Sequence, residues 1–371
     1  MSDTGDCTAN KHILLQHGRR CQQFTAFKAY MISPSTKMER LTLILLLFIA
    51  HLSSLSAQAP RPLVEYNAKD SLEAVQLLAD QSLQSPLDFA RRLCGRPYVA
   101  HTLERGDEHL VVNLRGLDCA TLVETASALA MARRQLDRMQ RAPLRNGPQH
   151  ADNDSIARKP QDAHSPTYRP WEAFCRALKS IRYRNGHCNG YLSRLHYLSF
   201  WIDDHKRRGN IVEVQLPAKL TKMRRTDIHY MSRHATKYPG LKNADDVRRI
   251  AALEAQQTGQ TFAYLPQEAC GLPKSELQDI HDGDIICIVT TLDGLDYSHQ
   301  GLAFWDNDGK LHLLHASSAK GKVIADTRPL DTYLKGIKTS IGIRVLRIQT
   351  PTRNARQMPQ RPARQKQGED K

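Results

Sequence analysis

Apolar and polar positions recur with two different periods along the chain. Apolar side chains return every three or four residues over 68–94, 119–134 and 191–207, which predicts helices there. From residue 283 onward the runs are short, apolar or β-branched, and separated by Gly, Asp and Asn, which predicts an antiparallel meander. Helices first and strands later indicate an α+β fold. The predicted strands are 283–290, 298–305, 310–318, 322–326 and 342–348, with an isolated one at 211–216.

The N-terminal part lacks both periods. Residues 38–57 have a short charged start, an apolar run and small residues at the end, which is the form of a secretory signal peptide. We expect cleavage near Ala57 or Ala59, a protein exported to the periplasm or cell envelope, and no stable membrane span afterwards. An uncleaved anchor is the alternative, although the apolar run is short for a span. Residues 1–37 precede the signal, so we expect a mis-assigned extension and a start at Met38.

Residues 58–350 are expected to form a single domain. Within them, 135–168 is polar and rich in Pro, Asn, Asp and Gln, which predicts a long exposed excursion. Residues 351–371 have six basic and two acidic residues and few apolar ones, which is typical of a disordered basic tail. The formal net charge is +15, of which +8 falls on 58–350. This charge suits an anionic polymer, but no basic stripe with aromatic residues and no nucleic-acid motif occurs, so nucleic acid is not an expected partner.

A cysteine stands at the predicted start of the helix in "RGLDCATLVETASALAMARR" (115–134). Asp118 is well placed to cap this helix. If the helix begins at Cys119, the thiol lies over unpaired backbone N–H groups at the positive end of the helix dipole. That environment lowers a thiol pKa and favours the nucleophilic thiolate. A buried structural cysteine is the alternative. No CxxC pair occurs, so a zinc ribbon or a thioredoxin-type motif is not indicated.

A nucleophilic cysteine needs a base, and two histidines are placed to supply one. His299 opens one predicted strand and His315 closes the next, so a hairpin folded about Asn307 would set them opposite each other on one face. One imidazole could take the thiol proton while the other orients it. A core role for His315 is the alternative. A zinc site made by Cys119, His299 and His315 is also possible, but no ligand spacing supports it, and we expect no metal or cofactor.

Three stretches that hold these residues carry a resemblance to a known family. "LDCATLVET", "LDYSHQGLAF" and "LHLLHASS" resemble the NlpC/P60-type cell-wall cysteine hydrolases, a papain-like group. Within it they look most like the N-acetylmuramoyl-L-alanine amidase-like branch. The resemblance covers residues 90–348 in scattered blocks, and the excursion at 135–168 is longer than the family pattern leads one to expect. Further agreeing blocks are 95–104, 194–202, 231–241, 283–288 and 342–347.

The resemblance implies a papain-like α+β fold, with the nucleophile helix packed on a small antiparallel sheet. It implies hydrolysis of amide bonds in peptidoglycan fragments (muropeptides) by residues 58–350. Cys119 would attack, His299 would act as general base and then as acid, and His315 would hold the ring of His299. The Cys119 backbone N–H and a nearby donor would meet the oxyanion.

The resemblance specifies the candidate catalytic residues more closely than the bond that they cut. The branch resemblance favours the amide between N-acetylmuramic acid and L-alanine, and the wider group favours the bond between D-glutamate and the diamino acid. A papain-like acyltransferase and an inactive peptidoglycan-binding module are the other classes; the complete set of Cys119, His299 and His315 argues against the inactive module. Aromatic rings could stack on a sugar, and Arg194 could pair with a stem carboxylate, although core packing or a solvated arginine is equally compatible with the sequence. The candidate substrate-binding residues are Tyr98, Asp118, Arg194, His196, Tyr197, Trp201 and Ser298.

Overall fold

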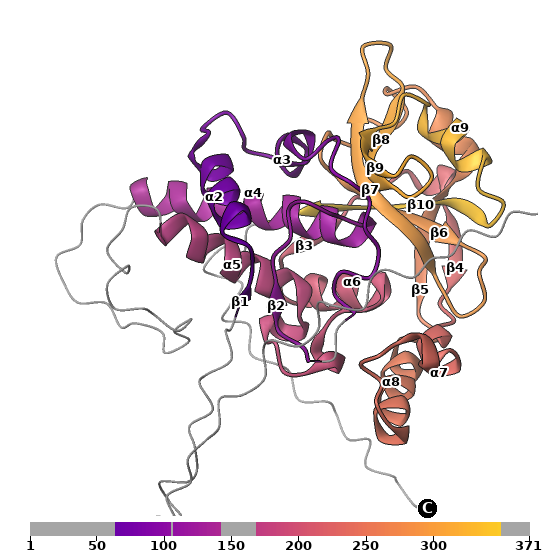
Figure 1. Ribbon diagram of the computed structural model, residues 1–371. Helices are drawn as coiled ribbons and strands as arrows, with labels where there is room; N and C mark the ends of the chain where they lie inside the picture. The colour runs from indigo at the N-terminus through magenta and orange to yellow at the C-terminus, as the bar shows by residue number, and fades with distance from the viewer. Residues whose placement is uncertain (1–63, 105–106, 142–167, 350–371) are drawn as a thin grey trace, which may run out of the picture. The chain divides into compact units, whose positions relative to one another are not determined.

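The computed structural model describes residues 64–104, 107–141 and 168–349 (Figure 1). These residues belong to one compact unit. The expected extension and signal peptide, residues 142–167 of the excursion and the basic tail lie outside the described residues, so those expectations stay predictions. Among the described helices, none is both long and apolar enough to cross a membrane.

The main element of the described region is a sheet of eight strands, in the order β4-β5-β10-β6-β7-β8-β9, with β3 also paired to β10 (Figure 1). Its pairings are antiparallel, which confirms an α+β fold with an antiparallel sheet. Two further strands, β1 (Val64–Glu65) and β2 (Leu110–Val111), form a small parallel pair. The strands of the main sheet are β3 (Ile211–Glu213), β4 (Lys222–Arg225), β5 (Thr261–Pro266), β6 (Ile285–Thr290), β7 (Tyr297–Trp305), β8 (Leu311–Ser317), β9 (Lys322–Ala325) and β10 (Ser340–Ile348).

The predicted meander is confirmed for β6 to β9 and wrong for the last strand. Instead of pairing with β9, β10 returns to the other side of β6 and also pairs with β5 and β3. The reason is that β10 carries apolar residues on both faces: Ile343 and Val345 pack in one core, Leu346 and Ile348 in the other. Only a position inside the sheet buries both sets.

Strand β6 is central for the same reason. Ile285, Cys287 and Val289 point into one core, while Ile286 and Ile288 point into the other. A strand covered on both faces reads as a continuous apolar run rather than an alternating one. This explains why the run at 283–290 has no polar face.

The first predicted helix is in fact two helices, α2 (Ala68–Ala79) and α3 (Pro86–Arg92). The Ser85 side chain accepts a hydrogen bond from the Asp88 N–H, and the Asp88 side chain accepts one from the Ser85 N–H. This capping box starts a new helix, and a proline at its first position suits a start and not an interior. The apolar spacing runs on across the break, so the spacing alone did not reveal it.

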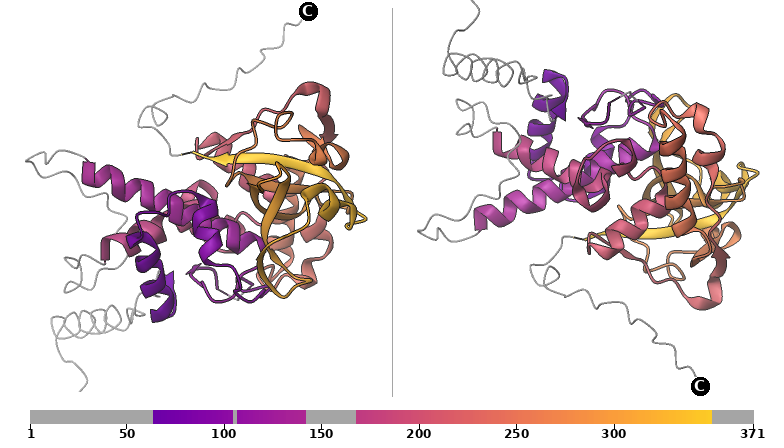
Figure 2. Two further views of the ribbon diagram at one scale, coloured as in Figure 1. Left: turned by 90° about the horizontal axis from the view of Figure 1, so that it is seen from above. Right: turned by 90° about the horizontal axis from the view of Figure 1, so that it is seen from below.

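Helix α4 (Cys119–Arg141) begins at the predicted residue and is longer than predicted. The first seven residues of the expected polar excursion form its last two turns. Its first half is buried and its end is exposed. It packs on α3, on α5 (Tyr168–Arg182) and on β7 and β8 (Figures 1 and 2). Helix α5 was not predicted.

Four more helices, α6 to α9, follow α5 in the described part of the chain. The helix predicted over 191–207 begins only at α6 (Leu198–Arg207), because the chain before it is a short 3-10 turn and an extended segment; Gly209, with φ of 67°, ends it as expected. Helix α9 (Leu330–Lys335) packs beside β8 and β10. The other two are α7 (Tyr230–Arg233) and α8 (Ala244–Gln257).

Candidate active site

The two histidines of the β7–β8 hairpin lie side by side, as the sequence predicted. The Nε2 atom of His299 is 2.6 Å from Nδ1 of His315, and the rings meet nearly edge to face, with centroids 4.9 Å apart. His315 is buried and His299 is partly exposed. One nitrogen of His299 is therefore committed to His315, and Nδ1 is left for another partner.

The register of this hairpin differs from the predicted one. Leu302 pairs with Leu314 and Ala303 with Leu313, so the turn is centred on Asp308 rather than Asn307. This register sets His315 opposite Gly301 and diagonal to His299. Gly301 and His299 are two residues apart on β7, so their side-chain positions lie on the same face of the sheet. The two imidazoles therefore still share a face. A Cβ on Gly301 would lie 3.0 Å from the His315 Cβ, so the missing side chain makes room for the His315 ring.

A β-bulge sets the position of His299. Ile288 of β6 pairs with His299, whereas Val289 pairs with Tyr297, so Ser298 is an extra residue on β7. Such bulges bend a strand and redirect the neighbouring side chain. Ser298, a candidate substrate-binding residue, is exposed at this bulge and adjoins His299.

We predict that Gly301→Ala weakens both the fold and the histidine pair. A Cβ at this position would lie 2.6 Å from the Leu314 carbonyl oxygen, so the backbones of β7 and β8 must separate. The expected loss is about 1–3 kcal/mol in the free energy of unfolding, together with lower activity, measured by thermal melting and turnover. Gly309→Ala is the control: its φ of 70° strains the turn, but its nearest neighbour is the Lys274 Cβ at 3.9 Å. It should lower stability and keep activity; equal activities in the two variants would contradict the prediction.

Cys119 occupies the expected place at the first position of α4. Asp118 caps the helix, since its Oδ1 accepts from the Thr121 N–H at 2.8 Å and its own N–H donates to Thr121 Oγ1 at 2.9 Å. The backbone N–H groups of Ala120 and Gln300 face the sulfur. Gln300 directly follows His299, so α4 brings the thiol to the strand that carries the candidate base. Among the described contacts, the thiol makes no direct hydrogen bond to the His299 ring.

The charge state of this pair is not the predicted one. Burial, and then the neighbouring Asp118 carboxylate, raise the pKa of Cys119 to about 12, although the backbone N–H groups act in the opposite direction. Burial, and then His315, lower the pKa of His299 to about 3. Both side chains keep some exposed surface but are surrounded mostly by protein. The expected lowering of the thiol pKa is therefore not found, because loss of hydration acts more strongly on the pKa than the backbone N–H groups at the helix start. The resting pair is a neutral thiol and a neutral imidazole.

A carboxylate that the sequence analysis missed lies behind His315. Asp326 Oδ2 is 3.6 Å from His315 Nε2, and the side chain of Asp326 is paired with Arg328. Tyr333 of α9 packs its ring edge-on against His315, with centroids 5.1 Å apart. The available signal was an acidic residue at the end of the predicted strand 322–326, the last letter of "KVIAD". Its neighbour could be identified only from strand pairing.

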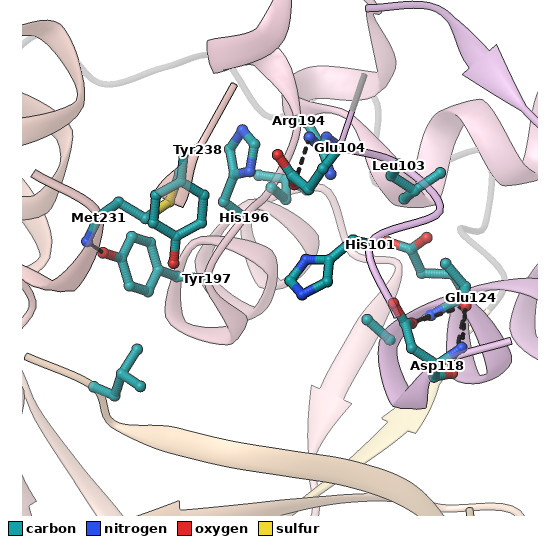
Figure 3. Close-up of a pocket in the computed structure, with 14 residues that line it drawn as sticks. His101, Leu103, Glu104, Asp118, Glu124, Arg194, His196, Tyr197, Met231 and Tyr238 are labelled. Atoms are coloured by element: carbon teal, nitrogen blue, oxygen red, sulfur yellow. Dashed lines mark hydrogen bonds and ion pairs between the residues drawn. The ribbon is translucent and has the colours of Figure 1, made fainter. Parts of the chain in front are cut away.

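A cavity of about 190 Å³ opens beside the first turn of α4 (Figure 3). Asp118, Ala120 and Thr121 contribute to one wall of it, next to the candidate nucleophile. Four of the candidate substrate-binding residues are among its lining residues: Asp118, Arg194, His196 and Tyr197. Cys119, His299 and His315 are not among its lining residues, so the cavity adjoins the candidate nucleophile only through the neighbouring residues of the first turn of α4.

Comparison with known proteins identifies the family. A family model described as AmiA-like, N-acetylmuramoyl-L-alanine amidase-like, matches residues 88–343. The chain belongs to this family. This confirms the predicted amidase-like branch, while membership of the NlpC/P60 superfamily and the papain-like type of fold stay predictions. No protein with a curated description matches the chain.

Solved structures resemble the AmiA-like chain over most of its length. A structure of an N-acetylmuramoyl-L-alanine amidase from Bacteroides uniformis is 35% identical, covers 74% of this chain and 100% of its own, and has a TM-score of 0.58. A Bacteroides fragilis protein described as a candidate xylanase is also 35% identical, covers 70% and 99%, and has a TM-score of 0.54. A Legionella pneumophila protein with 21% identity, coverage of 76% and 94% and a TM-score of 0.51 shows the fold alone.

Arg194 of the AmiA-like chain does not have the predicted freedom to bind a stem carboxylate. Its guanidinium is 2.9 Å from Glu104 (Figure 3). It is also 3.3 Å from Glu108, and its side chain is buried. Burial lowers the pKa of Arg194, but Glu108 and Glu104 outweigh this and raise it. A buried guanidinium needs partners inside the protein, and both carboxylates fill that need. Arg194 therefore supports the cavity wall through these ion pairs.

Two aromatic candidates for sugar stacking belong to the core. Trp201 is 5% exposed and packs on the His205 ring, with centroids 4.3 Å apart. Tyr197 is 6% exposed, and its hydroxyl donates to Glu254 at 2.6 Å and accepts from the Met231 N–H at 2.6 Å. The stacking prediction is wrong for Trp201, and Tyr197 reaches the cavity only as part of its wall. Helical spacing in this segment was compatible with core packing and with a binding surface, and the observed burial decides for the core.

His196 and Tyr98 keep positions next to the site. His196 lines the cavity and donates from Nε2 to the Tyr191 carbonyl at 2.8 Å; burial and then Arg194 lower its pKa well below the usual value, so it is neutral. Tyr98 is half-buried and does not line the cavity; burial, and then the charges of Cys119 and Asp118, raise its pKa.

The zinc alternative is not supported by the arrangement of its three residues. His299 and His315 point nitrogen to nitrogen, whereas two ligands of one ion converge on a common point. The cysteines of the described residues form no disulfide: all six are unpaired thiols.

The Cys119 side chain is partly exposed, and Cys119 adjoins Ala120, which lines the cavity.

Proposed function

We propose that the chain is a peptidoglycan amidohydrolase that uses Cys119 as nucleophile, in the manner of the NlpC/P60 papain-like hydrolases. One observation carries this proposal: the thiol at the start of α4 faces the Gln300 N–H, while the preceding residue, His299, is held by His315 at 2.6 Å. The candidate nucleophile, base and orienting group thus come from α4, β7 and β8, and residues that adjoin the candidate nucleophile line a cavity, which supports this assignment. Membership of an amidase-like family supports amide bonds of muropeptides as the substrate.

The neutral resting pair determines how the first step proceeds. His299 Nδ1 takes the thiol proton while the sulfur attacks the amide carbon, because neither ion is stable beforehand in this buried site. The oxyanion then lies near the free N–H groups at the start of α4. His299 returns the proton to the amine that leaves, and a thioester remains on Cys119. Water attacks the thioester with His299 again as base, which releases the acid and restores the thiol.

The amide between N-acetylmuramic acid and L-alanine is the proposed bond. The family description and the Bacteroides uniformis relative, which is named for this activity, support it. Hydrolysis of the D-glutamate–diamino acid bond is the alternative. We also propose that residues 38–57 direct export, which would bring the enzyme to peptidoglycan in the cell envelope.

A glycoside hydrolase is not favoured by the carboxylates of the cavity. Such enzymes need a pair of carboxyl groups free to act on the sugar. Here Glu104 is paired with Arg194, Glu124 with Arg182 at 2.7 Å, and Asp118 caps α4. Each of these carboxylates has a structural role that leaves it unsuited to catalysis on a glycosidic bond.

The proposal is tested with defined muropeptides and the purified protein. We expect mass detection to find free N-acetylmuramic acid sugar and a peptide that begins with L-alanine, while the same peptide without sugar stays intact. A site that binds the sugar uses that binding in the transition state, so a truncated substrate loses rate as well as affinity. Release of L-Ala–D-Glu, alone or sugar-linked, would establish the endopeptidase alternative. A product mass that changes when an amine acceptor is added would establish an acyltransferase.

A further inference from the structure

We propose that Asp326 sets the protonation pattern of the two histidines and thereby leaves the correct nitrogen of His299 free to act as base. Asp326 touches neither the thiol nor the cavity, so it is a positioning residue that acts through His315. Its catalytic consequence rests on the proposed function, whereas its effect on the imidazoles does not.

The contact between the two rings can be made in two directions. Only one proton lies between His299 Nε2 and His315 Nδ1, which are 2.6 Å apart. If His299 donates, its Nδ1 carries a lone pair and can accept the thiol proton. If His315 donates, His299 carries its own proton on Nδ1 and cannot act as base. The rings have the same positions in both cases, so the direction must be decided by a group outside the pair.

The carboxylate of Asp326, beside the far nitrogen of His315, is the group that favours one direction of this contact. His315 Nε2 is buried, has no hydrogen-bond partner among the described residues, and lies 3.6 Å from Asp326 Oδ2. A carboxylate only accepts, so it favours a proton on His315 Nε2 and disfavours a lone pair there. A proton on Nε2 leaves Nδ1 of the neutral ring as an acceptor. His299 must then donate from Nε2, and its Nδ1 is left free.

Asp326 is itself held in the charged, accepting state. Arg328 donates from Nε to Oδ1 at 3.0 Å and from Nη2 to Oδ2 at 2.7 Å. Burial raises the pKa of Asp326, but the Arg328 contacts outweigh it and lower the pKa to about 2. Arg328 lies over the Tyr333 ring, 4.9 Å from its centroid, and the same ring packs on His315. The carboxylate therefore stays ionised and fixed behind His315 at neutral pH.

The same hairpin contains a matched pair for comparison. Asp306 Oδ2 is 2.9 Å from His312 Nε2, and the other ring nitrogen of His312 faces the Asp326 carbonyl at 3.0 Å. Asp306 also accepts backbone N–H groups from Asp308 and Lys310, which an asparagine could still do through its oxygen. Asp306→Asn thus changes a carboxylate–histidine contact on β8 that does not involve His299 or His315.

The experiment reads the tautomers directly. The full chain is labelled with ¹⁵N-histidine, and ring nitrogen shifts and attached protons are recorded for wild type, Asp326→Asn and Asp306→Asn, with assignments from His299→Gln and His315→Gln. We expect Nε2–H on both His299 and His315 in the wild type. In Asp326→Asn the Arg328 donors should hold the amide oxygen, so its NH₂ faces His315 and donates, which moves both protons to Nδ1. Asp306→Asn should leave both rings unchanged.

Activity gives a second readout. Asp326→Asn should lower kcat for muropeptide hydrolysis by about 10²–10⁴-fold and leave KM nearly unchanged, because the His299 imidazole stays in place but is mostly in the tautomer that cannot accept the thiol proton, while the cavity is unchanged. A wild-type spectrum with Nδ1–H on His315 would overturn the inference, and that spectrum decides it even if Asp326→Asn fails to fold. Unchanged tautomers in a folded Asp326→Asn would overturn it as well. If the wild type shows the expected tautomers but cleaves no muropeptide, the proposed function is overturned and the inference about Asp326 is not.

Discussion

Cys119→Ala should abolish muropeptide hydrolysis while the protein stays folded. The thiol sulfur forms the only bond between enzyme and acyl group in the proposed reaction, so its removal should lower kcat on the order of 10⁶-fold. The fold should tolerate the change, because the side chain is small, partly exposed and not part of a disulfide, and because Asp118 and Thr121 make the helix cap without it. Turnover is measured by mass detection of released sugar, and folding by thermal melting.

Cys94 is the matched control for this variant. It is an exposed free thiol whose sulfur donates to the Ala90 carbonyl at 3.8 Å, within the first helical part of the chain. Cys94→Ala should keep most of the activity. A folded Cys119→Ala protein that still cleaved muropeptides, at either bond, at a rate near that of the wild type would exclude the proposed mechanism.

His299→Ala should be nearly as inactive as Cys119→Ala, and His315→Asn should retain measurable activity. The pKa of Cys119, raised to about 12, means that almost no thiolate exists at neutral pH without a base. Loss of His299 removes that base, whereas His315 acts only through its contact with His299 Nε2. An asparagine amide can still hydrogen-bond the imidazole, so we expect a smaller loss, within the range of about 10²–10⁴-fold typical of one acid–base contribution.

Single-turnover rates on a defined muropeptide rank the two variants. Folding of His315→Asn must be checked by melting, because His315 is buried against Tyr333 and Asp326. Equal inactivity of the two folded variants would mean that His315 does more than orient its neighbour. An active His299→Ala would assign the base to another residue.

Features that depend on neighbours in sequence were predicted correctly. The start of α4 at Cys119 follows from Asp118 and Thr121, whose capping contacts span three residues. The β6–β9 meander follows from apolar runs and from turns such as the one centred on Asp308. The pairing of the two histidines on one face follows from the period of two in a strand. Each of these depends on hydrogen bonds or side-chain alternation within a few residues.

Other features were hidden because they depend on parts of the chain far apart in sequence. The place of β10 beside β6 depends on the two hydrophobic cores, because each of them buries one apolar face of this strand. Arg194 reads as a surface residue until Glu104 and Glu108 meet it across about 90 residues. Trp201 was a candidate for sugar stacking and for core packing alike, since spacing alone cannot tell a buried face from a binding one.

The sequence by itself determined which residues are the candidates for the proposed chemistry: Cys119 at a helix start and two histidines on one face of a hairpin. Tertiary structure decided how they can react. Burial of the thiol beside Asp118 outweighs the helix dipole and keeps it protonated, and burial keeps His299 neutral. The hairpin register sets His315 over Gly301 and against Asp326. Loss of hydration and long-range contacts set protonation, and both arise only when the chain folds.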